Sequence, residues 1–186
     1  MPKPPSAGTH VDRAYLSKLW TAIQKGKPRG WKAGMALEYL IVRLFEIDGA
    51  KVSYSFNVPS SEGGVLEQFD GFIQVRGISA LLEMKDYSDK LNVEPLAKLR
   101  NQLARRPAGL VGCVFSRGGY TKQAISLASY MAPQAILLWT AEEIDAVVRK
   151  FSITEALEIK YSRLLRDGMS YFDFRGELSD EALSGG

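Results

Sequence analysis

Two short apolar segments carry charged side chains where a buried strand would normally carry apolar ones. They are residues 68–71 (QFDG) and 81–86 (LLEMKD), and each lies inside a run that otherwise predicts a buried β-strand. Burying a charged group costs free energy unless the group pairs with another charge or holds a metal ion. We therefore expect Asp70, Glu83 and Lys85 to lie together at one place in the fold.

The alternation of side chains along a strand decides which of these groups can meet. Glu83 and Lys85 share one face of their strand, whereas Leu82 and Met84 point to the other face. If the strand that carries Asp70 pairs with this one, the Asp70 and Glu83 carboxylates can approach a single divalent cation. The main-chain carbonyl of Met84 is a natural further ligand, because hard divalent cations prefer oxygen.

A fourth carboxylate belongs to a helix expected over residues 34–47, the strongest helical pattern in the chain. Its buried face is formed by Leu37, Leu40, Ile41, Leu44 and Phe45. Glu38 lies at the margin of this face, so a helix packed over the sheet could bring it to the same cluster. Alone, a helical glutamate is most often a surface residue, and an acid-x-lysine pair is most often an ion pair of an edge strand. Found together, with the glutamate on a helix and the acid-x-lysine pair on a strand, they favour a catalytic site.

The composition excludes several other kinds of site. The chain has 186 residues and a formal net charge of +3, which allows a polyanionic partner without requiring one. Its single cysteine, Cys113, and single histidine, His10, exclude a cysteine-based zinc site and make a Ser-His-Asp triad unsuitable. A catalytic metal would therefore be held by carboxylates and main-chain oxygens, which indicates Mg²⁺ or Mn²⁺. No apolar run is long enough to span a bilayer, and we expect a cytoplasmic protein.

The chemistry that suits these residues is metal-dependent cleavage of a phosphodiester bond. A cation held by Asp70 and Glu83 would offset the repulsion between the two acids and polarise the scissile phosphate. Lys85 would orient or help to deprotonate the attacking water and would stabilise the developing negative charge.

Hydrophobic periodicity predicts the order of elements along the chain. We expect helices over residues 11–25, 34–47, 93–105, 121–131, 142–150 and 154–166. We expect strands over residues 51–58, 65–75, 78–85, 110–115 and 135–139. This order predicts an α/β fold with a mixed β-sheet, an αβββαβ core flanked by helices, and extra helical segments at the N- and C-terminal ends.

The chain resembles the PD-(D/E)xK restriction-endonuclease-like superfamily, and within it most closely the Mrr-type catalytic domain, over residues 34–148. The resemblance rests on the segments GMALEYLIVRLFEIDGAKV, EQFDGFI, LLEMKDYS, GCVFSRGGYTKQAISLAS and AILLWTAEEID. The helix glutamate of the superfamily falls on Glu38, its strand aspartate on Asp70, and its acid-x-lysine on Glu83 and Lys85. We call these four the signature residues. Mrr-type proteins often have glutamine where Glu83 stands, so this version is nearer the general superfamily pattern.

The resemblance implies a Mg²⁺-dependent DNA endonuclease, with Mn²⁺ as a substitute, used in defence against foreign DNA. It implies that the two strand acids are metal ligands and that the lysine lies near the water. Cutting both strands is simplest for a homodimer, and a regulatory or targeting protein is a candidate further partner. A repair or recombination nuclease such as a Holliday-junction resolvase is the nearest alternative, since it uses a similar pattern on the same fold. A catalytically silent DNA-binding or assembly module is the third, although the intact signature set argues against it.

We expect three regions along the chain. Residues 1–10 form a disordered leader, and residues 11–150 form the nuclease domain, with its core at 34–148. Residues 151–186 hold a C-terminal helix and a tail that would serve dimer contacts or docking.

Side chains near the signature residues are candidates for contact with nucleic acid. They are Lys32, Tyr87, Arg117 and Lys122. Several further basic residues follow the acid-x-lysine strand, Lys98 among them, but a solvated helix face is the more ordinary reading for any single one. Gln102, on the same helix, could contact the site, but we expect it to be an exposed helical glutamine.

Overall fold

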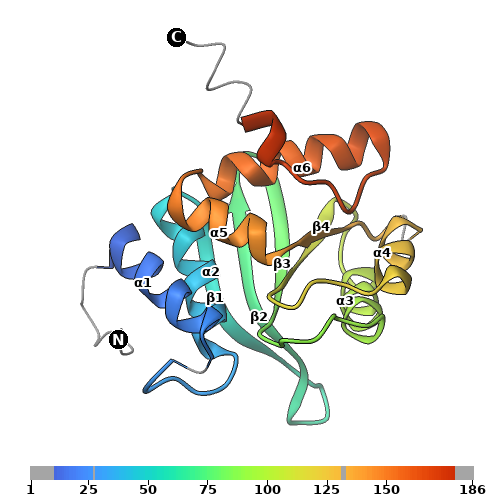
Figure 1. Ribbon diagram of the computed structural model, residues 1–186. Helices are drawn as coiled ribbons and strands as arrows, with labels where there is room; N and C mark the ends of the chain where they lie inside the picture. Colours follow the sequence, from blue (N-terminus) through green and yellow to red (C-terminus); the bar gives the residue numbers. More distant parts are fainter. Residues whose placement is uncertain (1–10, 27, 131–132, 179–186) are drawn as a thin grey trace.

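A five-stranded mixed sheet forms the centre of the molecule in the computed structural model, which describes residues 11–26, 28–130 and 133–178 (Figure 1). The strands are β1 (Lys51–Pro59), β2 (Val65–Val75), β3 (Ile78–Lys85), β4 (Leu110–Ser116) and β5 (Ile136–Trp139). They lie side by side in chain order, the first three antiparallel and the last two parallel to β3. The leader expected over residues 1–10 lies outside the described residues.

The helices occur where the sequence pattern predicts them. They are α1 (Arg13–Gln24), α2 (Met35–Ile47), α3 (Glu94–Ala104), α4 (Lys122–Ser129), α5 (Ala141–Arg149) and α6 (Ile153–Asp167). Each expected helix and strand is present, and its ends lie within two residues of the expected ones. The predicted fold class, an α/β protein with a mixed sheet flanked by helices, is confirmed.

Local sequence signals account for several of these boundaries. The turn between β2 and β3 is Arg76–Gly77, and both residues have positive φ, 50° and 80°. Two positive φ values are what a tight two-residue hairpin requires. Helix α5 begins with a capping box, in which the Thr140 side chain accepts from the Glu143 N–H and the Glu143 side chain accepts from the Thr140 N–H.

Alternation along the strands separates two hydrophobic cores. Ala80, Leu82 and Met84 of β3 pack on the face covered by α1, α2, α5 and α6. Leu81 lies on the opposite face, where Leu96 and other residues of α3 and α4 complete the second, smaller core. Glu83 has the same parity as Leu81 and is therefore directed toward α3.

The described residues 151–178, which follow α5, pack into the larger core. Phe174 is fully buried there, and the main-chain carbonyl of Ser170 accepts a hydrogen bond of 3.0 Å from Leu138 N at the outer edge of β5. The Lys160 ammonium is fully buried and donates to Glu143 Oε1 at 2.5 Å and to the Phe172 carbonyl. Within the described part of the chain, none of the helices has the length and apolar character needed to cross a bilayer.

Candidate active site

The site begins where β2 and β3 separate. Their ladder of paired residues ends at Gly71↔Leu82, although β3 stays paired with β4 to its last residue. Beyond the ladder, the Asp70 carboxylate replaces the missing strand partner, because its Oδ2 accepts a hydrogen bond of 2.8 Å from Met84 N. The N–H and C=O of one strand residue point to the same side, so the Met84 carbonyl faces the same opening.

A close approach of α2 to β2 brings in the helix carboxylate. A Cβ added at Gly71 would lie 3.0 Å from Val42 Cγ2 and 3.3 Å from Leu82 Cδ1, so a larger residue there would push the helix away. Glu38 lies one turn before Val42 on this helix. It shares with Asp70 the lining of a small cavity of about 100 Å³ between α2 and the sheet.

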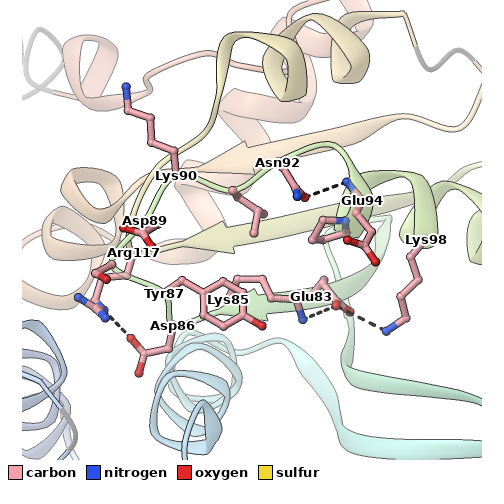
Figure 2. A pocket seen from close by; sticks show the side chains of 13 residues that line it. Glu83, Lys85, Asp86, Tyr87, Asp89, Lys90, Asn92, Glu94, Lys98 and Arg117 are labelled. Atoms are coloured by element: carbon pink, nitrogen blue, oxygen red, sulfur yellow. Dashed lines mark hydrogen bonds and ion pairs between the residues drawn. The ribbon is translucent and has the colours of Figure 1, made fainter.

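The acid-x-lysine pair forms the other half of the site. Glu83 is 1% exposed, and its Oε1 lies 2.5 Å from Lys85 Nζ. The ammonium of Lys98, which α3 contributes, lies 3.7 Å from the same oxygen. Figure 2 shows the two lysines reaching the Glu83 carboxylate from opposite sides. One buried negative charge therefore faces two positive ones.

Electrostatics links the two halves into one site. Burial raises the pKa of Asp70, the Glu83 carboxylate raises it further, and the Met84 N–H and the nearby lysines only partly offset this. Burial also raises the pKa of Glu38, with Asp70 as the next cause. Burial would lower the pKa of Lys85, but the charge and contact of Glu83 outweigh it and raise the pKa above its ordinary value. The neighbouring carboxylates thus oppose the ionisation of Asp70 and Glu38, as carboxylates gathered at one position do.

The chemical types of these residues suit a hard divalent cation, although their carboxylates contact other groups of the protein in this structure. No three His, Cys, Asp or Glu side chains are already arranged as a metal cage in the described ranges. The reason is visible in the contacts: Asp70 holds the Met84 N–H and Glu83 holds Lys85. Crowded carboxylates whose ionisation is unfavourable, next to a main-chain carbonyl, are nevertheless the donor set that Mg²⁺ or Mn²⁺ takes.

A larger cavity of about 750 Å³ opens beside Glu83 and Lys85. Its wall is the loop over residues 86–92, which is held against the loop that follows β4. Leu91 N donates to the Gly119 carbonyl at 2.8 Å, and Thr121 N donates to the Leu91 carbonyl at 3.0 Å. A Cβ added at Gly118 would lie 2.1 Å from the Asp89 carbonyl oxygen, so the two loops are in direct contact.

The candidates for nucleic-acid contact divide between this cavity and other surfaces. Tyr87 and Arg117 both line the cavity, Tyr87 with more than half of its surface exposed. Arg117 Nε donates to Asp86 Oδ1 at 2.5 Å, so its charge is already paired. Lys32 and Lys122 are exposed but are not among the residues that line the cavity.

Helix α3 contributes two residues that the sequence analysis interpreted as ordinary surface residues. Lys98 contacts Glu83, but its place in the sequence is that of an ordinary surface lysine. The expectation that Gln102 is exposed is wrong, because it lies 3% exposed against the second core. Its Nε2 donates to the Gln68 carbonyl at 3.4 Å, which ties α3 to the strand that carries Asp70. Both contacts depend on how α3 packs on β2 and β3, and this long-range packing gives no local signal that could have revealed either of them.

Comparison with known proteins identifies a family over most of this region. Residues 33–148 match the model of the family Mrr_cat, described as restriction endonuclease. The curated proteins include no match to this chain.

Solved structures with a similar arrangement include restriction enzymes. The small subunit of the heterodimeric restriction endonuclease R.BspD6I superposes with a TM-score of 0.54 and 12% identity, covering 83% of this chain and 89% of that one. The DNA modification-dependent restriction endonuclease AspBHI gives a TM-score of 0.48 at 16% identity, covering 78% of this chain and 39% of that one. The protein of unknown function AF1548 gives 0.45 at 14% identity, with 72% and 77% covered.

Proposed function

Because the chain belongs to the Mrr_cat restriction endonuclease family, we propose that it is a metal-dependent DNA endonuclease that acts in defence against foreign DNA. We propose that it cuts duplex DNA as a homodimer, since two copies of one site related by a twofold axis match the two strands of a duplex.

One observation carries this proposal. The strand carboxylate Asp70 and the pair Glu83 and Lys85 meet where β2 and β3 separate, and α2 brings Glu38 beside them. An ordinary ion pair of an edge strand would not explain this arrangement, because β3 is paired in the sheet on both sides up to the opening. It also would not explain why Glu38 and Asp70, each of which raises the pKa of the other or has it raised by Glu83, are gathered beside this pair.

Each signature residue has a role that follows from its position. Asp70 and Glu83 would hold the cation, with Glu38 and the Met84 carbonyl completing its ligands, and the bound cation would stabilise the negative charge that develops on the phosphate. Lys85, kept in place by Glu83, presents its ammonium to the attacking water or to a phosphate oxygen. Tyr87 at the cavity rim would contact the sugar-phosphate backbone.

A cleavage assay on two substrates tests the proposal and separates it from its alternatives. Supercoiled plasmid and a four-way DNA junction are incubated with Mg²⁺ or Mn²⁺ and either the wild type or Lys85→Ala. We expect the wild type to nick or linearise the plasmid and the variant to lose this activity. Preferred cutting of the junction would instead assign the chain to recombination. DNA binding without cleavage by either protein would identify a silent binding module.

A further inference from the structure

Lys98 occupies a position that the signature does not account for. Its ammonium lies 3.7 Å from Glu83 Oε1, yet 54% of its side chain is exposed while the carboxylate is 1% exposed. Leu99 and Leu103 of the same helix are buried in the second core, which fixes the direction in which Lys98 projects. The lysine therefore stands at the boundary between the buried site and the open cavity.

Charge balance leaves this ammonium incompletely neutralised. Glu83 carries one negative charge, and Lys85 is the nearer partner at 2.5 Å. Glu94, one turn earlier on α3, also lines the cavity, but the ion pair of Lys98 is with Glu83. The other cations of the cavity differ from Lys98, since Arg117 is paired with Asp86 and Lys90 points away from the site in Figure 2.

We propose that Lys98 is a second cationic residue of the active site, which binds a backbone phosphate of the DNA strand that enters the 750 Å³ cavity. The proposal rests on the proposed nuclease function. A lysine ammonium is a point charge on a flexible stem, suited to a phosphate contact that carries no sequence information. Lys85 and Lys98 reach Glu83 from opposite sides (Figure 2), so a strand lying across the carboxylate would meet one ammonium on each side of it.

Measuring DNA binding without metal tests the contact of Lys98 with a phosphate separately from catalysis. A short fluorescein-labelled duplex is titrated in EDTA over a range of salt concentrations with the wild type, Lys98→Gln, Lys98→Arg and Arg100→Gln. Arg100 is the matched control, because it is an exposed cation of the same helix that does not line the cavity. Thermal melting verifies that each variant is folded.

We expect Lys98→Gln to reduce the slope of log K against log salt by about 0.9, the loss of one phosphate contact. Lys98→Arg should keep the wild-type slope, and so should Arg100→Gln. In cleavage assays Lys98→Gln should raise KM more than it lowers kcat, because the contact is made before and during the reaction alike.

Three results would overturn the inference. The first is a wild-type slope for Lys98→Gln, and the second is an equal loss for Arg100→Gln, which would indicate general surface charge. The third is absence of salt-dependent binding by the wild type. These outcomes differ from failure of the proposed function, which would show as absent cleavage by the wild type with Mg²⁺ and Mn²⁺ on every DNA substrate.

Discussion

Asp70 is held where its negative charge is unfavourable for the folded state. Burial and the neighbouring Glu83 carboxylate raise its pKa, and the hydrogen bond from Met84 N compensates only in part. Electrostatic repulsion between neighbouring carboxylates is expected where a cation is to be bound, because the bound cation relieves the repulsion. The proposed role of Asp70 as a metal ligand therefore comes with a lower stability of the metal-free fold.

Asp70→Asn should raise stability in metal-free buffer while it abolishes cleavage. The amide oxygen can still accept from Met84 N, and each kcal/mol of relief would raise Tm by about 2–4 °C. A folded acid with a raised pKa loses stability as pH rises from its ordinary pKa through the folded one. The advantage of the variant should therefore be absent at acidic pH and develop toward neutral pH in thermal melts. A Tm difference that is independent of pH would contradict this.

Sequence reasoning reached the signature residues but not their surroundings. A charged group inside an apolar strand is visible in the sequence, so Asp70, Glu83 and Lys85 could be singled out from the pattern. The contact of Lys98 with Glu83 and the burial of Gln102 depend on how α3 docks on the sheet. Helical periodicity gives the face that a helix buries but not the neighbour it meets.

At the scale of elements, the opening between β2 and β3 is the feature that creates the site. Alternation predicts a regular ladder and gives no sign that pairing stops at Gly71↔Leu82. The close packing of α2 on Gly71 sets how Glu38 approaches the opening, and only the absence of a side chain at Gly71 allows it.

Gly71→Ala tests this dependence on packing. The added methyl would lie 3.0 Å from Val42 Cγ2, so it should displace α2, destabilise the fold by about 1–3 kcal/mol and slow cleavage. Truncation of the opposing side chain in the double variant Gly71→Ala/Val42→Ala should restore space and recover part of the activity. Chemical unfolding and plasmid nicking measure the two effects. A double variant that is slower than the single one would show that Gly71 has another role.

The wall of the larger cavity depends on a second glycine. In Gly118→Ala the added Cβ would meet the Asp89 carbonyl oxygen, so the loop over residues 86–92 must move. We expect weaker DNA binding and a Tm several degrees lower, as overpacking against the main chain costs about 1–3 kcal/mol. Gly176→Ala is the control, since nothing lies within 4 Å of the position its Cβ would occupy. Equal melting temperatures of Gly118→Ala and Gly176→Ala would indicate that the loop over residues 86–92 is not held in a fixed position against Gly118.

At the scale of the whole molecule, the described C-terminal segment completes the larger core. In the helix sequence ITEALEIKYSRLLRD, Lys160 resembles an ordinary surface lysine, yet its side chain is fully buried and forms an ion pair with Glu143. No local signal predicts this, because the pair joins α6 to α5 across the fold. The role of residues 151–186 in dimer contacts or docking stays a prediction.

The Lys160–Glu143 pair should be a major support of this arrangement. Lys160→Met leaves the Glu143 carboxylate buried without its cation, and we expect a loss of about 3–5 kcal/mol in the free energy of unfolding. Replacing both partners with apolar residues, as in Lys160→Met/Glu143→Leu, should recover much of the loss. Denaturant unfolding of the wild type, the single variant and the double variant measures these free energies of unfolding. A single variant as stable as the wild type would show that the pair contributes little.

The proposed joint action of Asp70 and Glu83 in cation-dependent cleavage of DNA can be measured directly. Its most direct test is the rate of plasmid nicking at saturating Mg²⁺ or Mn²⁺ for the wild type, Asp70→Asn, Glu83→Gln and the control Asp167→Asn, an exposed aspartate at the end of α6. We expect both site variants to be slower by about 10²-fold or more while folding normally, and Asp167→Asn to match the wild type. Cleavage at the wild-type rate by either site variant would contradict it.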